Sequence, residues 1–292
     1  MAESVRIQAA AKVNLHLRVY GRREDGFHGI LSLFQALTLA DTLVIRSLKE
    51  SDTIEVEGDF DCPMQRTSVY KAAVAYREAT GSKRGLSISV DKRVPAGAGL
   101  GGGSSDAAAV LIGLEALLRG GLSASGLTSL GASIGSDVPF FLSAASAIVS
   151  GRGEIVDPIE ARDDYSLVLV FPGEAVSTAW AYSLLDSERP DDSAEPDLRR
   201  EEIGRAYRGE IQAWPFANSF EGPVGRARKP ILEAKGLVLG LGASFAAMSG
   251  SGNSIFGVFE DETLARAAVA KLGTMGFDAC AASPLARCTS LD

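Results

Sequence analysis

The chain has 292 residues, 46% of them hydrophobic, and its 37 acidic and 29 basic side chains give a formal net charge of −8 at pH 7. Such a chain can bury a large core and suffices for one large domain or two ordinary ones. The acidic balance argues against nucleic acid or an anionic membrane as the main partner, so any phosphate site must be built locally from backbone amides, a few cations and a metal ion.

Secretion and membrane insertion are also disfavoured. The first residues carry no basic segment followed by an apolar one, and no apolar run is long enough to span a bilayer. The three cysteines, Cys62, Cys280 and Cys288, are widely spaced and form no C-x-x-C pair. That pattern is typical of free thiols rather than of a disulfide framework or a zinc site. We expect a cytoplasmic protein without a membrane or nucleic-acid partner, and the sequence leaves its oligomeric state open.

The first expected element is an extended segment over residues 5–19. In KVNLHLRV (12–19) apolar residues alternate with the polar side chains of Lys12, Asn14, His16 and Arg18. This period of two predicts a strand with one face on a core and the polar groups in a row on the other. The turn GRREDGFHG (21–29) follows. A second apolar run, a helix and a short strand are then expected over residues 30–47, 68–78 and 86–90.

The glycine-rich stretch VPAGAGLGGGSS (94–105) leads into the apolar helix DAAAVLIGLEALLRGG (106–121), which ends at paired glycines. A helical or looped region and the segment IGSDVPFFL (134–142) come next. The remaining patterns predict a strand, a charged solvated loop, two strands around a Gly/Ser turn, a helix and a final strand, over residues 165–173, 186–200, 244–259, 263–272 and 277–281. The expected fold class is α+β, in two halves that meet between residues 158 and 164.

Gly97, Gly99 and Gly102 match the dinucleotide fingerprint G-x-G-x-x-G. A dinucleotide site also requires a second buried strand that ends in an acidic residue about 20 positions further on. No acidic residue occurs between Glu115 and Asp137, and the strand before the loop alternates polar and apolar residues, unlike a central parallel strand. No G-K-[ST] follows the glycines, which argues against a Walker P-loop. The NAD interpretation is therefore weak.

The same stretch is nevertheless suited to a phosphate. Glycines at positions 97, 99 and 101–103 let backbone amides approach an anion closely. Ser104 and Ser105 are expected where a helix begins, beside unpaired N–H groups and the positive end of the helix dipole. A glycine loop that ends in an ordinary serine cap is the alternative. Asp106 is unfavourable beside an anion and could serve the helix dipole or a metal; the sequence does not distinguish these roles.

At this point a family resemblance becomes evident. PAGAGLGGGSSDAAA (95–109) resembles the ATP loop of the GHMP small-molecule kinases. Three further segments are similar to motifs of the 4-diphosphocytidyl-2-C-methyl-D-erythritol kinase family: AAAKVNLHLRVYGRREDGFHGILSLFQAL (9–37), IGSDVPFFLSAASAIVSGRGE (134–154) and MSGSGNSIFGVF (248–259). They occur in the family's order and span nearly the whole chain, whereas residues 186–214 align with nothing in it.

The resemblance implies a two-domain GHMP-kinase fold, with domains over residues 1–160 and 161–292 and the active site in the cleft between them. It implies transfer of the ATP γ-phosphoryl group to the 2-hydroxyl of the cytidyl substrate, a step of the non-mevalonate isoprenoid pathway, with Mg²⁺ as neutralising ion. No metal ligand can be assigned. The ATP-binding residues implied by the motif are Pro95, Gly97, Gly99, Leu100, Gly101, Gly102, Gly103, Ser104 and Ser105.

Lys12 and Asp137 are the implied catalytic pair. The resemblance makes Asp137 the base that accepts the hydroxyl proton, and Lys12 the group that holds this carboxylate and the attacking oxygen. Asn14 would contact the methylerythritol end. Without the resemblance, a strand lysine usually points to solvent, and Asp137 could simply cap a helix whose first turn contains Pro139.

The implied substrate pocket includes two residues of the turn. Phe27, where the family usually has Tyr, would stack on cytosine, and His28 would contact the polar edge of the base. Tyr182 would supply a second aromatic ring, with Thr178 nearby. The alternatives are a local packing contact for Phe27 and a surface position for His28. Gly250, Ser251 and Gly252 resemble the loop that closes beside the substrate phosphates, although a plain hairpin turn would have the same composition.

Residues 218–221 (NSFE) fit a capping box at a helix start. The family usually shows Asn-Asp here, and Ser219 in place of Asp leaves any charge-based role in doubt, so the capping box is preferred. Two rival functions stay open: another GHMP kinase, for homoserine, mevalonate or a sugar, and a nucleotide-binding regulator without catalysis. The DGFHG turn argues against the first rival, and the presence of both Lys12 and Asp137 argues against the second.

Overall fold

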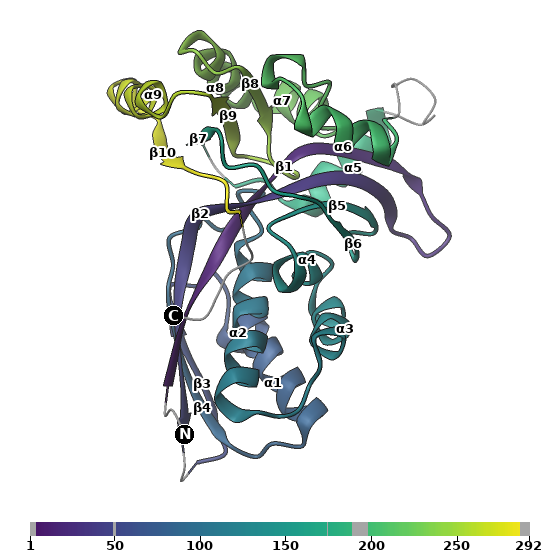
Figure 1. Cartoon of the computed structure of the whole chain (residues 1–292), viewed down its shortest axis with the longest axis vertical. Coiled ribbons are helices and arrows are strands. Elements are labelled where there is room, and N and C mark those ends of the chain that lie inside the picture. Colours follow the sequence, from purple (N-terminus) through teal and green to yellow (C-terminus); the bar gives the residue numbers. More distant parts are fainter. Residues whose placement is uncertain (1–3, 49–50, 174, 189–197, 287–292) are drawn as a thin grey trace.

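The computed structural model describes residues 4–48, 51–173, 175–188 and 198–286. The chain folds into two α+β units stacked along the long axis of the molecule (Figure 1). Within the described part of the chain, no helix is long and apolar enough to cross a membrane.

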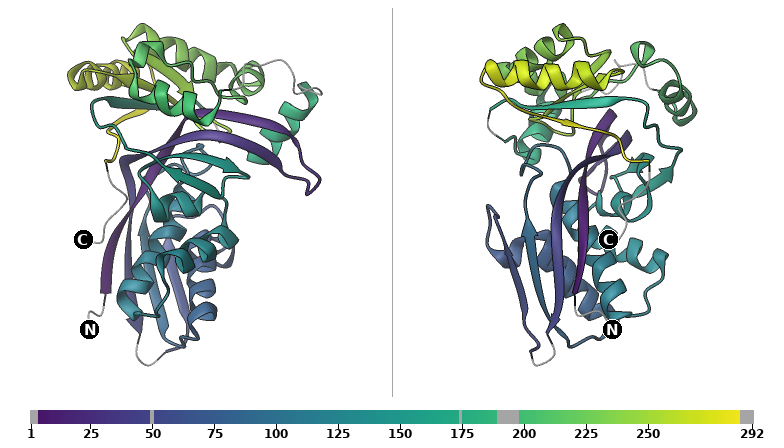
Figure 2. Two further views of the ribbon diagram at one scale, coloured as in Figure 1. Left: turned by 45° about the vertical axis from the view of Figure 1, so that its right-hand side comes forward. Right: turned by 60° about the vertical axis from the view of Figure 1, so that its left-hand side comes forward.

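The first unit is built on a mixed sheet. Its strands are β1 (Ser4–Arg22), β2 (His28–Leu48), β3 (Ile54–Gly58), β4 (Gly85–Asp91), β5 (Ser146–Gly151) and β6 (Ile155–Pro158), in the order β3-β4-β2-β5-β6 with β1 paired to β2. All neighbours are antiparallel except β3 and β4. Helices α1 (Ser68–Thr80), α2 (Gly102–Leu118), α3 (Ala124–Ile134) and α4 (Val138–Ser143) gather beside this sheet, with α2 packed on β1 and β2 (Figure 2).

The second unit has a smaller sheet. Its strands β7 (Ser166–Phe171), β8 (Phe245–Met248), β9 (Ile255–Phe259) and β10 (Asp278–Ala282) are antiparallel, in the order β10-β7-β9-β8. Around it lie α5 (Thr178–Glu188), α6 (Arg200–Arg208), α7 (Glu221–Ala227), α8 (Lys229–Gly240) and α9 (Glu262–Thr274). Short 3₁₀ turns occur at Met64–Arg66 and Ile211–Ala213. Between residues 158 and 166 the chain passes from the first sheet to the second, near the expected boundary. The division at 160 stays a prediction.

The long β1–β2 hairpin joins the two units. It rises out of the first sheet and runs beneath the second unit (Figure 1). Two of the three register shifts between β1 and β2 lie in this stretch, between Ala10 and Lys12 and between Asn14 and His16. Each such bulge exchanges the two faces of the strand. As a result Ala11, Val13 and Leu15 pack into the core of the second unit, while Lys12 and Asn14 face the space beside α2 and α4.

This geometry corrects the expectation for the alternating strand. The polar residues do not form one continuous row, because the second bulge separates Asn14 from His16, whose ring lies 5.9 Å from that of Phe216. They do not face solvent either: Lys12, Asn14, His16 and Arg18 are all at most 5% exposed.

Other expected elements occur with shifted ends. The glycine-rich helix begins at Gly102, four residues before the expected start, and ends at Leu118. The expected loop over 186–200 is partly helical, because Asp186 to Glu188 end α5 and Arg200 begins α6. Residues 189–197 of that loop lie outside the described residues. The strands around the Gly/Ser turn, the helix near 263–272 and the final strand are confirmed as β8, β9, α9 and β10.

Candidate active site

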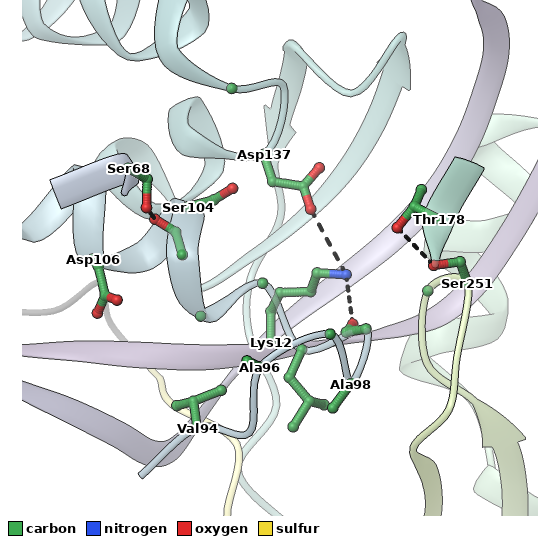
Figure 3. Close-up of a pocket in the computed structure, with 18 of the residues that line it drawn as sticks. Lys12, Ser68, Val94, Ala96, Ala98, Ser104, Asp106, Asp137, Thr178 and Ser251 are labelled. Atoms are coloured by element: carbon green, nitrogen blue, oxygen red, sulfur yellow. Dashed lines mark hydrogen bonds and ion pairs between the residues drawn. The ribbon is translucent and has the colours of Figure 1, made fainter. Parts of the chain in front are cut away.

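A cavity of about 600 Å³ lies where the two units meet. Its wall combines β1, the glycine-rich loop, the first turns of α1, α4 and α5, and the β8–β9 loop (Figure 3). The site therefore draws on segments from both ends of the chain.

The glycine-rich loop forms one wall of this cavity. Gly97, Gly99 and Gly101 have φ values of 66°, 75° and 72°, in the left-handed region that favours glycine. Gly101 is the N-cap residue of α2 and has no side chain to cap it, so the first amides of a 17-residue helix stay open toward the cavity. The serines lie where the helix begins, as expected, but they do not cap it, so the alternative of an ordinary serine cap is wrong. They lie within its first turn, where Ser104 lines the cavity and Ser105 is buried.

Close contact with the β8–β9 loop explains why Gly99 has no side chain. A Cβ on Gly99 would lie 2.1 Å from the carbonyl oxygen of Ser249. The Ser249 hydroxyl in turn donates to the Gly99 carbonyl at 2.9 Å and accepts from the backbone amide of Asn14 at 3.3 Å. Gly250 and Gly252 have φ values of 56° and 95°. The two glycine motifs are thus pressed together beside β1.

Lys12 lies at the centre of the site. Its Nζ donates to the Asn14 Oδ1 at 2.5 Å and to the Gly99 carbonyl at 3.1 Å, and lies 3.8 Å from the Asp137 Oδ2 (Figure 3). Burial lowers the pKa of Lys12, and the Asp137 carboxylate partly offsets this. With the side chain only 4% exposed, the alternative of a solvent-facing lysine is wrong.

Asp137 faces this lysine instead of capping a helix. It occupies the N-cap position of α4 with φ −84° and ψ −11°, and its side chain accepts no capping hydrogen bond. Pro139 does lie in the first turn, as the pattern indicated. The carboxylate is 30% exposed and lines the cavity next to Lys12. The alternative role as a helix cap is therefore wrong, and the carboxylate is left available for a ligand.

The residues expected to bind cytosine make two separate contacts. The His28 ring stacks on Tyr182 with centroids 4.7 Å apart, and its Nε2 lies 2.7 Å from the Asp186 carboxylate. Phe27, 53% exposed, instead lies beneath the Arg152 guanidinium at 4.9 Å. Of this group only Tyr182 and Arg152 line the cavity itself. Thr178 also lines it, and its hydroxyl lies 3.1 Å from that of Ser251 across the cleft (Figure 3).

Residues 218–221 do not form the expected capping box. Helix α7 begins at Glu221 with Phe220 as N-cap and no side-chain cap. The Asn218 amide nitrogen donates instead to the Met248 and Gly250 carbonyls, at 2.7 and 2.8 Å. The Ser219 hydroxyl accepts from the Val19 amide at 3.0 Å. Asn218 therefore positions the β8–β9 loop, a role that the local pattern did not indicate.

An ion-pair cluster lies behind the glycine loop. Lys92 contacts the carboxylates of Asp41 and Asp106, the latter at 2.7 Å, and Asp41 accepts from the amides of Arg93 and Val94. Burial raises the pKa of Asp106 to about 7, although Lys92 acts to lower it. Asp106 is thus paired with a lysine, which the sequence left undecided. No group of three or more His, Cys, Asp or Glu suited to a metal occurs among the described residues.

Comparison with known proteins gives consistent matches. The GHMP kinases N terminal domain matches residues 67–145, and the GHMP kinases C terminal domain matches 196–277. The 4-diphosphocytidyl-2-C-methyl-D-erythritol kinase of Thermodesulfovibrio yellowstonii is 38% identical over 266 residues, covering 90% of this chain and 92% of that protein. The enzyme of the same name from Syntrophotalea carbinolica is 41% identical over 281 residues, covering 95% and 98%.

Solved structures agree with these sequence matches. A crystal structure of 4-(cytidine 5'-diphospho)-2C-methyl-D-erythritol kinase has a TM-score of 0.82 and 38% identity, covering 96% of this chain and 98% of that one. A homoserine kinase from Cytophaga hutchinsonii has a TM-score of 0.73 at 17% identity, covering 100% and 98%. The second likeness concerns the fold alone.

Proposed function

The chain belongs to the 4-diphosphocytidyl-2-C-methyl-D-erythritol kinase family of the GHMP kinases, and from this premise we propose how its cleft carries out the ATP-dependent phosphorylation of 4-diphosphocytidyl-2-C-methyl-D-erythritol. The γ-phosphoryl group of ATP moves to the 2-hydroxyl of the methylerythritol unit, a step of the non-mevalonate isoprenoid precursor pathway. The relatives do not favour the rival functions, another GHMP kinase or a regulator without catalysis.

Asp137 and Lys12 are proposed to act on the attacking hydroxyl. The Asp137 carboxylate accepts its proton as the new O–P bond forms and the bond between the γ-phosphorus and the bridging oxygen of ADP breaks. Lys12 lies beside this carboxylate and adds positive charge where phosphoryl oxygens gather. The observation that carries the proposal is the position of the Lys12 Nζ, 3.8 Å from Asp137 and 3.1 Å from the Gly99 carbonyl.

The α2 N-terminus and the glycine loop are proposed to hold the ATP phosphates. The amides of the first helical turn are open beyond Gly101, and the helix dipole favours an anion there. The Ser104 hydroxyl lines the same wall. Ser68 stabilises the turn from α1 by donating to the Gly103 carbonyl at 2.6 Å. The protein is acidic overall, so these local donors supply the positive potential that ATP needs.

We propose Mg²⁺ as the neutralising ion. Mg²⁺ keeps several waters and is usually bound through one or two carboxylates together with substrate phosphates. The cavity wall offers donors of this kind, the Ser104 hydroxyl and the partly exposed Asp137 carboxylate among them, and the described residues form no complete protein cage for a metal. When bound, the ion would neutralise charge on the phosphates, and the Ser104 hydroxyl and the Asp137 carboxylate would hold it from the cavity wall.

The acceptor substrate is proposed to lie on the opposite side of Lys12 from the glycine loop. Phe27, His28 and Tyr182 would enclose its cytosine, since one aromatic ring is exposed and the other two are already stacked. Thr178 and Ser251 would contact its phosphates and Asn14 its methylerythritol end. We also propose a cytoplasmic location, supported by the free thiols of Cys62 and Cys280 and by the need for ATP; Cys288 lies outside the described residues.

A transfer assay with γ-labelled ATP tests this function. The wild-type protein and Asp137→Asn are each supplied with the cytidyl substrate, methylerythritol phosphate, homoserine or mevalonate at equal concentration. We expect labelled product from the cytidyl substrate alone, and its loss in the variant. Equal phosphorylation of homoserine or mevalonate by the wild-type protein would contradict the assigned substrate.

A further inference from the structure

Arg152 occupies a turn that the glycines on either side hold in place. Gly151 and Gly153 have φ values of 72° and 121°. A Cβ on Gly151 would lie 2.8 Å from the Glu154 carboxylate, and one on Gly153 would lie 3.1 Å from the Ser136 Cβ. The Glu154 carboxylate also accepts from the Arg152 amide at 2.6 Å. The β5–β6 turn is therefore packed against the segment that carries Asp137, and it sets where the Arg152 side chain begins.

The side chain of Arg152 extends from this turn toward Phe27, where the cytosine of the substrate is proposed to bind. Its guanidinium lies 4.9 Å from the centre of the Phe27 ring, and the residue lines the cavity. A Cβ on neighbouring Gly153 would lie 3.3 Å from the Asp137 Oδ1. Arg152 thus spans the distance between Asp137, the proposed general base, and the exposed ring of Phe27.

The other cationic side chains on the cavity wall either have close partners or lie on another part of the wall. Lys12 is bonded to Asn14 and Gly99 and faces Asp137, and Lys92 is held between two aspartates. Arg66, in the 3₁₀ turn before α1, and Lys71, in the first turn of α1, line the wall near Ser68, which bonds the glycine loop. Arg152 has one weak ion pair, between its Nε and the Glu154 Oε1 at 4.0 Å, and its side chain is 39% exposed. Its planar donor face is therefore largely available to an anion in the cavity.

We propose that Arg152 binds the diphosphate of the acceptor substrate. This inference rests on the proposed function, because the diphosphate joins the cytidine to the methylerythritol unit. With the base at Phe27 and the reacting hydroxyl at Asp137, the diphosphate has to cross the region that Arg152 spans. A guanidinium pairs with phosphate oxygens in a bidentate manner, and the contact with Phe27 holds the Arg152 guanidinium beside the proposed cytosine site. An acidic protein needs such a local cation to hold a second anionic substrate.

Calorimetric titration with cytidine and with CDP isolates this role, because the two ligands share the base and differ in the diphosphate. The wild-type protein is expected to bind CDP more tightly than cytidine. Arg152→Gln should weaken CDP binding by about 10- to 100-fold and leave cytidine affinity unchanged, as expected for a charged hydrogen bond. Arg152→Lys should recover part of the difference. Arg266→Gln removes one positive charge from an exposed i,i+4 pair on α9 and should change neither affinity.

Kinetics give a second readout. Arg152→Gln should raise the KM for the cytidyl substrate by a similar factor, with the KM for ATP and the melting temperature unchanged. An unchanged ratio of CDP to cytidine affinity in Arg152→Gln would overturn the inference and show that Arg152 only covers Phe27. A fall in kcat alone would overturn it as well. A wild-type protein that binds neither ligand would instead contradict the proposed cytosine site, a distinct result.

Discussion

Asp137 stands at the N-cap of α4 without capping it, and its Oδ2 faces the Nζ of Lys12 at 3.8 Å. The position of Asp137 fits its proposed catalytic role, in contrast to an aspartate that serves as a helix cap. Asp261, by comparison, caps α9 fully, because its carboxylate accepts from the amides of Thr263 and Leu264. The chain therefore contains a matched pair of helix-start aspartates for experiment.

Asp137→Ala and Asp261→Ala should have opposite effects. Removal of the Asp137 carboxylate should lower kcat by roughly 10²-fold or more, the size of general-base catalysis, with little change in stability. Removal of the Asp261 cap should cost about 1 kcal/mol of stability, with kcat unchanged. Steady-state kinetics and urea denaturation of both variants measure this. A stability loss in Asp137→Ala as large as in Asp261→Ala, with kcat retained, would contradict the catalytic assignment.

Gly101→Ala and Gly81→Ala distinguish backbone strain from damage to the ATP site. Both glycines have φ near 70°, so each alanine should cost about 1 kcal/mol of stability. A Cβ at Gly81 meets nothing within 4 Å, whereas one at Gly101 would lie 3.0 Å from Phe141 and 3.1 Å from the Lys12 side chain. We expect a loss of ATP affinity of roughly tenfold or more, about 1.4 kcal/mol, in Gly101→Ala alone, measured by calorimetry. Equal ATP affinity in the two variants would remove the loop from the ATP site.

Phe27→Ala should affect the cytidyl substrate and not ATP. Stacking on an aromatic face is worth about 1–3 kcal/mol per base, so the KM for the cytidyl substrate should rise roughly 5- to 100-fold. Phe27→Tyr keeps the ring and should be close to neutral. Leu264→Ala on α9 is a matched control, since Leu264 is 52% exposed and Phe27 is 53% exposed. A normal KM in Phe27→Ala would place the base elsewhere.

The raised pKa of Asp106 predicts that the stability of the fold depends on pH. The Asp106 carboxyl group titrates near 3.8 in an unperturbed setting and near 7 in the fold, chiefly because of burial. Between these values the folded state keeps a proton that the unfolded state has released, so stability falls as the pH rises through this window. The stability of the wild-type protein relative to Asp106→Asn should therefore be greater at pH 5 than at pH 8. Denaturant titrations at both values measure the difference, and a difference that grows with pH would contradict the shift.

Local patterns in the sequence predicted much of the candidate site. The glycine run predicted a phosphate loop followed by a helix, because glycine and helix-forming residues act through the backbone next to them. The order of the motifs indicated the family, and the same motifs named Lys12 and Asp137. The roles of these residues stay predictions that the variants above test.

Tertiary structure alone decided which alternatives hold for individual residues. The bulges that turn Lys12 into the cleft depend on pairing with β2, and the sequence pattern of β1 alone predicted an uninterrupted strand. Asn218 looked like a helix cap and instead bonds the loop after β8. The contact between the Arg152 guanidinium and the Phe27 ring joins two turns far apart in the chain. Such contacts have no local signal, because burial and hydrogen-bond partners arise only when distant segments pack together.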